Sequence, residues 1–297
     1  MKNIIVVTGG AGFIGSNLIE QLVLSTKYNI ISIDNYSSGT KNNHINSARI
    51  KYFKNDTKNI SKILHNIRSK INSIFHFGEF SRIYQSFKKT GICFDANIAG
   101  TANVFNFALN NNIRVIYSAT SASLGNNGSD MNLSPYSFSK AKNVELLENL
   151  KRWFDFRCEI VYFYNVYGPR QINQGDMAAV IGIFERFYKK KKPLPVVSPG
   201  SQMRRFTHVA DTISGCLLAW KNKKNAHYCI VNKESFSILD IAKMFTKRIV
   251  FLPSRPGERF VSTLIKKNLN SKVINIWAKI KLRDYISNFT GNNLFNK

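Results

Sequence analysis

The chain has 297 residues, of which 44% are hydrophobic and 20% are charged. This balance is typical of a globular protein with a sizeable core, and it excludes a disordered chain. Lysine and arginine number 43 against 17 acidic residues, so the formal net charge is +26.

The positive charge is spread along the chain, and only residues 189–192 form a run of lysines. Because no aromatic ladder accompanies this run, we expect no nucleic-acid partner, and polyanion binding stays an alternative. No apolar run reaches the roughly 18 residues of a bilayer span, and the N-terminus shows no cleavable leader. The four cysteines form no CxxC pair and the histidines show no ligand spacing. We therefore expect a cytoplasmic protein with no membrane segment and no metal site.

Strand-like and helix-like segments alternate through the first half of the chain. Residues 4–7 form a β-branched run, typical of a strand buried on both faces. A glycine-rich turn breaks this run, and a helical pattern follows over residues 13–24. Further strands are predicted at residues 30–34, 74–77, 114–118 and 159–163, and further helices at 96–109 and 136–154. This alternation predicts an α/β fold with a doubly wound parallel sheet.

After residue 164, prolines and glycines break the chain into short elements. This change predicts a smaller, loop-rich C-terminal lobe that binds substrate. Two segments, 212–220 and 228–231, are regular enough to return to the main sheet as a helix and a strand. The predicted dinucleotide-binding domain is thus 1–164 plus about 208–232, and the lobe is about 165–207 and 233–297.

Three glycines, Gly9, Gly12 and Gly15, follow the first strand and open the first helix. A tight turn there favours residues without a Cβ, and a pyrophosphate must approach the backbone closely. The helix N-terminus offers free N–H groups and a partial positive charge to the anion. The spacing, in this strand–turn–helix setting, predicts dinucleotide binding.

Asp34 ends the second predicted strand, about twenty residues after the glycine turn. A carboxylate in this place can accept hydrogen bonds from both ribose hydroxyls and would repel a 2′-phosphate, which favours NAD over NADP. A simple Asp–Asn turn is the alternative interpretation. Asp56, in a later loop, is a weaker candidate for contact with the adenine edge.

Tyr136 and Lys140 stand four positions apart in the segment YSFSK. On a helix this spacing puts both side chains on one face. A free tyrosine has a pKa of about 10, which a nearby ammonium lowers, so that the phenolate can take a proton from a sugar hydroxyl. An ordinary solvated helix start is the alternative. The hydroxyl-rich segment 118–123 follows a strand end, where open α/β sheets bind their ligands.

These motifs together resemble the extended short-chain dehydrogenases/reductases, and most closely their nucleotide-sugar epimerases, dehydratases and decarboxylases. TGGAGFIG at 8–15, a strand ending in Asp, a Ser/Thr-rich strand end and YxxxK follow in the family's order. The second half continues the resemblance. YNVYGPR at 164–170 is similar to the family's FNVYGPR, RRFTHVAD at 204–211 to its RDFxHVxD, and RPGE at 255–258 to its RPGD/E.

The resemblance implies a role for each matching residue. Tyr136 would be the base, Lys140 would lower its pKa and bind the nicotinamide ribose, and Thr120 would be the hydroxyl partner. The residues implied in NAD binding are Gly9, Gly12, Phe13, Ile14, Gly15, Asp34, Asn35, Asp56 and Lys140. In the substrate, Asn165 would bind a phosphate, Arg204 and Arg255 would clamp the diphosphate with their planar forks, and Glu258 would accept from the nucleoside ribose.

Two positions after Thr120 bear on the reaction that the resemblance implies. Family dehydratases carry Asp-Glu there, and family decarboxylases carry Glu at the second position, whereas this chain has Ser121 and Ala122. Epimerisation of a nucleotide-diphosphate sugar through a transient keto-sugar, as in UDP-hexose 4-epimerases, needs neither carboxylate. Another enzyme on the same scaffold, a 4,6-dehydratase or keto-sugar reductase, is an alternative. A non-catalytic NAD-binding or polyanion-binding protein is another.

The chain departs from the family where many relatives have HxAA, because residues 76–82 read HFGEFSR. We expect Glu79, Ser81 and Arg82 beside the nicotinamide or the sugar, with Glu79 a candidate extra acid or base. An intrahelical or loop ion pair of Glu79 with Arg82 is the simpler alternative. Relatives commonly dimerise through two helices per subunit, which predicts a homodimer through 96–109 and 137–154.

Overall fold

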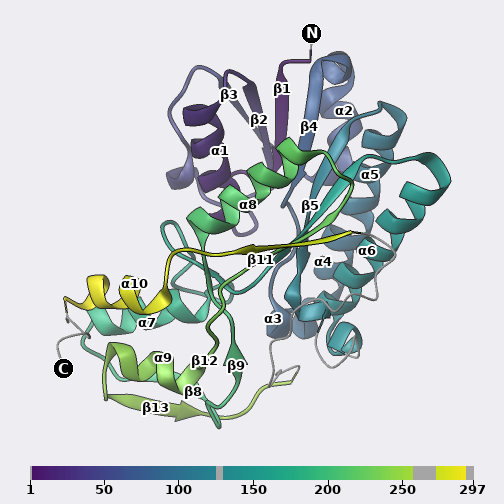
Figure 1. The fold of residues 1–297 in the computed structure, drawn as a ribbon. Helices are drawn as coiled ribbons and strands as arrows, with labels where there is room; N and C mark the ends of the chain where they lie inside the picture. The colour runs from purple at the N-terminus through teal and green to yellow at the C-terminus, as the bar shows by residue number, and fades with distance from the viewer. Residues whose placement is uncertain (1, 125–129, 257–271, 292–297) are drawn as a thin grey trace.

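A parallel sheet forms the centre of the molecule. The computed structural model describes residues 2–124, 130–256 and 272–291. Within these ranges the sheet has eight strands: β1 (Ile4–Thr8), β2 (Asn29–Asp34), β3 (Ile50–Lys54), β4 (Ile71–His76), β5 (Arg114–Thr120), β6 (Cys158–Phe163), β11 (His227–Val231) and β14 (Val273–Trp277). The strand order is β14-β11-β6-β5-β4-β1-β2-β3, and all neighbours run parallel (Figure 1). The predicted doubly wound parallel α/β fold is confirmed.

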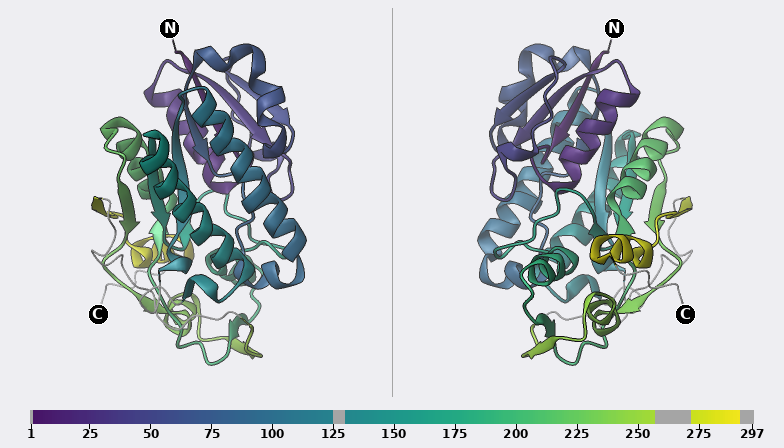
Figure 2. Two further views of the ribbon diagram at one scale, coloured as in Figure 1. Left: turned by 90° about the vertical axis from the view of Figure 1, so that its right-hand side faces the viewer. Right: turned by 90° about the vertical axis from the view of Figure 1, so that its left-hand side faces the viewer.

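Helices cover both faces of this sheet (Figure 2). Apolar side chains of α1 (Phe13–Ser25) and α8 (Val209–Asn222) pack on one face. Those of α2 (Ile60–Leu64), α5 (Thr101–Asn110) and α6 (Pro135–Phe154) pack on the other. The result is a sandwich of three layers, in which both faces of each inner strand are covered.

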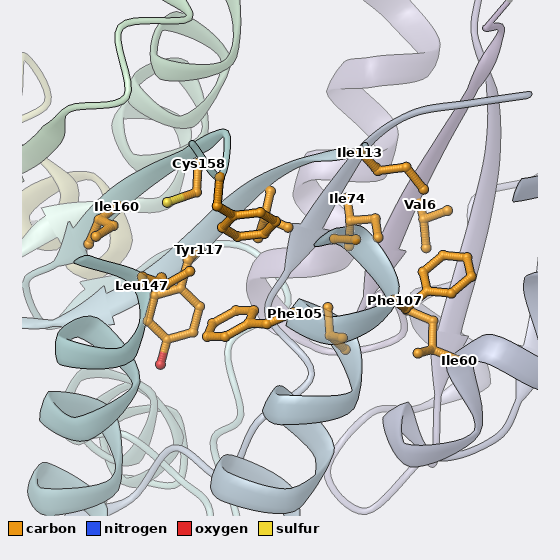
Figure 3. Close-up of a cluster of buried hydrophobic side chains, with 14 of the residues drawn as sticks. Val6, Ile60, Ile74, Phe105, Phe107, Ile113, Tyr117, Leu147, Cys158 and Ile160 are labelled. Atoms are coloured by element: carbon orange, nitrogen blue, oxygen red, sulfur yellow. The ribbon is translucent and has the colours of Figure 1, made fainter. Parts of the chain in front are cut away.

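The strand β1 shows how the sequence pattern produces these two cores. Ile4 and Val6 belong to the core beneath α5, whereas Ile5 and Val7 belong to the core beneath α1 and α8. Successive side chains of a strand point to opposite faces, so a continuous β-branched run serves both. Figure 3 shows the first of these cores, in which Phe105 of α5 stands beside Tyr117 of β5 with ring centroids 5.4 Å apart.

The helix α6 carries the YxxxK segment, and its ends have clear signals. The hydroxyl of Ser134 caps the N-terminus by accepting a hydrogen bond from the Ser137 N–H, and Pro135 takes the first helical position. At the other end Asp155 adopts a left-handed conformation with φ 50°. The helix predicted from residue 136 is therefore present and begins one residue earlier.

The helix predicted at 96–109 is longer than expected. The chain turns helically from α4 (Thr90–Phe94) through a π-helical segment, η4 (Asp95–Gly100), into α5. A short helix, α3 (Ile83–Lys88), precedes it. The remaining short turns of the sheet-bearing part are η1 (Lys41–Asn43), η2 (Thr57–Asn59), η3 (His65–Lys70) and η5 (Ser121–Ser123).

A separate set of elements gathers below the sheet in Figures 1 and 2. It has its own apolar core, to which Phe184, Leu194, Phe245 and Ile286 belong. Its elements are α7 (Val180–Lys189), β8 (Leu194–Val197), α9 (Ile238–Phe245), β13 (Ile249–Leu252) and α10 (Leu282–Thr290), with the strand pairs β7 (Val166–Tyr167)–β10 (Thr207–His208) and β9 (Met203–Arg204)–β12 (Phe236–Ser237).

One strand departs from the boundaries expected from the sequence. The sequence predicts that residues 233–297 belong to the lobe, but β14 within this range pairs in parallel with β11 at the edge of the main sheet. Its alternating Val273, Ile274 and Ile276 pack against the two sheet cores. Among the described residues, no helix combines the length and the apolar character that a membrane crossing demands.

Candidate active site

The glycine turn between β1 and α1 lies where the sheet order reverses, with β4 on one side of β1 and β2 on the other. Gly9 has φ +70°, and a Cβ on it would stand 2.8 Å from the backbone of Phe77. A Cβ on Gly15 would stand 2.1 Å from the Gly9 carbonyl oxygen. Both positions therefore require glycine, the first for its conformation and the second for the close approach of α1.

The N-terminus of α1 is suited to an anion. Gly12 makes no side-chain capping bond, and the first turn of the helix holds no acidic residue. Phe13 and Ile14, the first residues of the helix, line a cavity of about 710 Å³. The first N–H groups of a helix lack intrahelical partners and carry partial positive charge, so this end can receive a pyrophosphate.

Asp34 ends β2 beside the turn and is 8% exposed. Its Oδ2 accepts from the Ala11 N–H at 2.9 Å, and its Oδ1 accepts from the Tyr36 N–H at 2.8 Å. Burial raises the pKa of this carboxyl, while the backbone hydrogen bonds oppose the rise. Nearby, Asn35 donates to the carboxylate of Asp56 at 3.1 Å. All three of these side chains line the same cavity as the glycine turn.

The cavity brings together the site residues predicted from the sequence. Every such residue that the structure describes lines it: Gly9, Gly12, Phe13, Ile14, Gly15, Asp34, Asn35, Asp56, Glu79, Ser81, Arg82, Thr120, Tyr136, Lys140, Asn165, Arg204 and Arg255. Glu258 lies outside the described residues. The sheet-bearing part of the chain and the smaller set of elements therefore both contribute residues to the lining of this cavity.

Tyr136 stands at the start of α6 and Thr120 at the end of β5, and both line the cavity. Burial raises the pKa of Tyr136 to about 12, against the opposing effects of the Thr120 hydrogen bond and the Arg82 charge. The carboxylate of Glu79 adds to the rise. Lys140 was expected to lower this pKa, but it is not among the groups that do so. Its ammonium is instead paired with a carboxylate.

That carboxylate belongs to Glu79, which forms an ion pair with Lys140. The side chains are 3% and 4% exposed, respectively. The Lys140 ammonium also donates to the Ser118 carbonyl and stands 4.3 Å from the centroid of the Tyr117 ring. Glu79 pairs here with Lys140 rather than with Arg82, so the simpler interpretation of a Glu79–Arg82 loop pair is wrong.

A buried polar network behind this pair was not predicted from the sequence. Oε1 of Glu79 accepts from Thr101 at 3.0 Å, from Tyr117 at 3.0 Å and from Asn143 at 3.1 Å. The one available signal was the position of Asn143, three residues after Lys140 on the same helix. Thr101 and Tyr117 come from distant elements and gave no local signal.

His76 extends the network to the glycine turn. The Thr8 hydroxyl accepts from the N–H groups of Phe77 at 3.1 Å and Gly78 at 3.0 Å, so its own proton faces His76 Nδ1 at 2.7 Å. The imidazole then carries its proton on Nε2, which donates to Thr101 at 2.9 Å. Burial lowers the pKa of His76 to about 4, so the ring is neutral at pH 7.

The residues expected to hold the substrate come from the loops beyond the sheet. Asn165, with φ 36°, donates to the Arg205 carbonyl at 2.9 Å. Arg204, in β9, donates to the Met203 carbonyl at 2.9 Å. The Arg255 guanidinium stands 5.2 Å from the centroid of the Tyr84 ring. Two arginines on one cavity wall suit an anionic ligand.

The turn, the uncapped helix end and Asp34 fit a dinucleotide whose ribose meets a carboxylate. Comparison with known proteins agrees with this fit. The model of the NAD dependent epimerase/dehydratase family matches residues 5–232. The chain is therefore a member of this family of NAD-dependent enzymes, which comprises nucleotide-sugar epimerases, dehydratases and decarboxylases.

Three similar proteins illustrate the range of activities within this family. A Methanocaldococcus jannaschii protein with the provisional name UDP-glucose 4-epimerase is 30% identical over 74% of each chain. The UDP-N-acetyl-alpha-D-glucosaminuronate decarboxylase of Bacillus cytotoxicus is 28% identical over 82% of this chain and 79% of its own. The UDP-glucuronic acid 4-epimerase of Bacillus cereus, solved with UDP-glucuronic acid and NAD, is 26% identical, covers 98% and 93% of the two chains, and superposes with a TM-score of 0.77.

Proposed function

We propose that this chain is an NAD-dependent epimerase of a nucleotide-diphosphate sugar, of the UDP-hexose 4-epimerase type. The observation that carries the proposal is the placement of Tyr136 and Thr120 together on the wall of the cavity that also holds the glycine turn. Ser121 and Ala122 follow Thr120 and bring no carboxylate to that wall. The pair supports a proton transfer at a sugar oxygen, without the added acid and base of an elimination.

Gly9, Gly12 and Asp34 would hold NAD in the cavity, where it would supply the acceptor and donor of the hydride that leaves the sugar carbon and returns to its opposite face. In its ionised, phenolate form Tyr136 would accept the proton of the sugar hydroxyl as the carbonyl forms, and the resulting neutral phenol would return that proton when the alcohol re-forms. The Thr120 hydroxyl holds the reacting oxygen beside the phenol. Arg204 and Arg255 anchor the diphosphate, so the keto-sugar can turn over without leaving the cavity.

The position of Glu79 favours epimerisation over a dehydratase that would use this residue as its extra acid or base. One oxygen of Glu79 faces the Lys140 ammonium, and the other accepts from Thr101, Tyr117 and Asn143. A carboxylate engaged by four donors is held in place and is poorly free to exchange protons with a sugar.

The test is to incubate the purified protein and NAD with UDP-, GDP-, ADP- and dTDP-sugars and to resolve the products by NMR. We expect one of these sugars to give its epimer with no net change in NADH absorbance. Net formation or consumption of NADH would identify a dehydrogenase or keto-sugar reductase instead. A product that has lost water or carbon dioxide would also overturn the proposal.

The variant Tyr136→Phe tests the assignment of the base. We expect a fall in kcat of about 10²- to 10⁴-fold, the usual contribution of a general base. Tyr28→Phe is the matched control, because Tyr28 packs against Trp220 outside the cavity lining. Full activity of Tyr136→Phe would exclude the phenol as the base. A chain that binds NAD but converts none of the sugars would favour the non-catalytic alternative.

We also propose that the chain forms a homodimer through the surface of α4, η4 and α6. Ile92, Ile98 and Phe138 expose 58%, 38% and 37% of their surface on these neighbouring elements. Burying them against a second copy would remove apolar area from water. Sedimentation analysis should give twice the chain mass, and Ile92→Glu should return a monomer.

A further inference from the structure

The proposed reaction requires the nicotinamide ring to lie close to Lys140. The hydride leaves the same sugar carbon whose hydroxyl proton passes to Tyr136, so the ring must approach that carbon to about 3–3.5 Å. Lys140 follows Tyr136 by one turn of α6, a rise of about 6 Å along the helix. Both residues line the cavity that holds the glycine turn. The Lys140 ammonium therefore belongs to the surroundings of the hydride transfer.

Glu79 reaches the same place from the glycine turn. The N–H of Gly78, the residue before it, donates to the Thr8 hydroxyl at 3.0 Å. A Cβ on Gly9 would stand 2.9 Å from the Gly78 Cα, so the chain here is packed directly on the turn that can receive a pyrophosphate. The next side chain along, Glu79, forms the ion pair with Lys140. The pair therefore connects the cofactor end of the cavity with α6.

The charge of Lys140 is offset by the Glu79 carboxylate, and its other contacts are with neutral groups. The ammonium donates to the Ser118 carbonyl and stands 4.3 Å from the centroid of the Tyr117 ring. The side chains of the ion pair are 4% and 3% exposed, so water does little to screen them. The balance of charge at this wall therefore depends on Glu79.

The two redox forms of the cofactor differ in charge at this wall. An oxidised nicotinamide ring carries a positive charge, and a reduced ring is neutral. A buried ammonium with no anionic partner would repel the oxidised ring, because charges in a site of low dielectric interact strongly over several ångströms. A carboxylate in contact with the ammonium cancels most of that field. An epimerase needs its cofactor oxidised at the start of each cycle, so this cancellation favours the reaction.

We propose that Glu79 is a positioning residue that acts through Lys140, holding the ammonium in place and offsetting its charge so that the site retains the cofactor in its oxidised form. This inference rests on the proposed function, which requires NAD as the hydride acceptor beside Tyr136. The network behind the pair supports it. Thr101, Tyr117 and Asn143 all donate to Oε1 of Glu79 and stabilise the anionic carboxylate.

The test measures a ratio of affinities, without sugar and without turnover. Displacement of NADH by NAD, followed through NADH fluorescence, gives the ratio of the Kd for NAD to the Kd for NADH. At pH 6, where the ammonium keeps its proton, we expect Glu79→Gln to raise this ratio about tenfold or more. At pH 8, Lys140→Met leaves the carboxylate alone and should lower the ratio. Contacts that both forms of the cofactor share cancel in the ratio, so a purely structural role would not move it.

The matched control is Glu159→Gln. Glu159 is also a buried glutamate, paired with Arg114 at 2.8 Å, but it does not line the cavity. This variant should leave the ratio unchanged. The double variant Lys140→Met/Glu79→Gln carries neither charge and should return the ratio close to the wild-type value. If Glu79→Gln fails to fold, Lys140→Met against the double variant still isolates the carboxylate, and the ratio should be lower in Lys140→Met.

An unchanged ratio in the folded Glu79→Gln protein would overturn the inference. A shift in the same direction for Glu79→Gln and Lys140→Met would also overturn it, because the two charges have opposite signs. The proposed function can fail separately. If the ratio moves as expected but no sugar is epimerised, the redox role of Glu79 stands and the epimerase assignment falls. If a sugar is epimerised and the ratio does not move, only the role of Glu79 is lost.

Discussion

The ammonium of Lys140 lies against the carboxylate of Glu79, in a site where the two side chains are 4% and 3% exposed. The motif around Lys140 suggested an ammonium that acts on Tyr136 and on a ribose. Burial alone lowers the pKa of Lys140, and the carboxylate opposes that effect. The pair therefore keeps the lysine charged in a water-poor place, and it limits what that charge can do for the phenol.

Removing both partners of this pair should cost less than the sum of the two single changes. We expect Lys140→Met to lower the free energy of unfolding by about 3–5 kcal/mol, because it leaves a buried charge without its partner. The double variant Lys140→Met/Glu79→Gln should lose less than the sum of the single variants. Urea denaturation of all four proteins at pH 7 measures the coupling. Additive losses would show that the two charges do not interact.

Gly15 tests the close contact at the glycine turn. In Gly15→Ala the new Cβ would stand 2.1 Å from the Gly9 oxygen, so the turn must open. We expect a loss of about 1–3 kcal/mol in unfolding free energy and weaker NAD binding. Gly91→Ala is the control, because no atom lies within 4 Å of its Cβ and alanine favours a helix by about 1 kcal/mol. Thermal unfolding and calorimetric NAD titration measure both effects. Equal behaviour of the two variants would contradict the steric argument.

Asp34 should select NAD over NADP. In Asp34→Asn the negative charge is lost, and the amide must meet the N–H groups of Ala11 and Tyr36. We expect the Kd for NAD to rise about tenfold or more, the loss of a hydrogen bond to a charged group, and the preference over NADP to shrink. Fluorescence titration with each cofactor measures this. Asp240→Asn, in the lobe beside Ser237, should change neither affinity. An unchanged preference in Asp34→Asn would contradict the role of this carboxylate.

His76 should make the protein sensitive to acid. The pKa of this ring is about 4 in the fold, against 6.5 for an ordinary histidine. Between these values the unfolded chain binds the proton and the folded chain does not, so stability falls as the pH falls. The group accounts for about 3 kcal/mol across that window. Urea denaturation at several pH values should show a shallower loss for His76→Gln, whereas His65→Gln, at an exposed position, should keep the wild-type slope. Equal slopes for wild type and His76→Gln would exclude His76 as the source.

Much of the fold could be predicted from local pattern. The β-branched run at Ile4–Thr8, the glycine spacing at Gly9, Gly12 and Gly15 and the helix that starts at Pro135 all depend on neighbours in the chain. Strand alternation, tight turns and helix caps follow from contacts over a few residues. The parallel sheet then brings the carboxyl ends of its strands to one edge, so the cavity residues could be named in advance.

The partner of Lys140 was not open to such prediction. Glu79 follows β4 and Lys140 lies in α6, so 61 positions separate the two residues. Whether a carboxylate after a strand faces a sugar, a neighbouring arginine or a lysine depends on how the helices pack across the sheet. The place of β14 at the sheet edge has the same cause. Sequence by itself determined the elements and the chemical groups, because these depend on short-range geometry. Only the tertiary structure decided which charges meet, because burial and long-range packing set that choice.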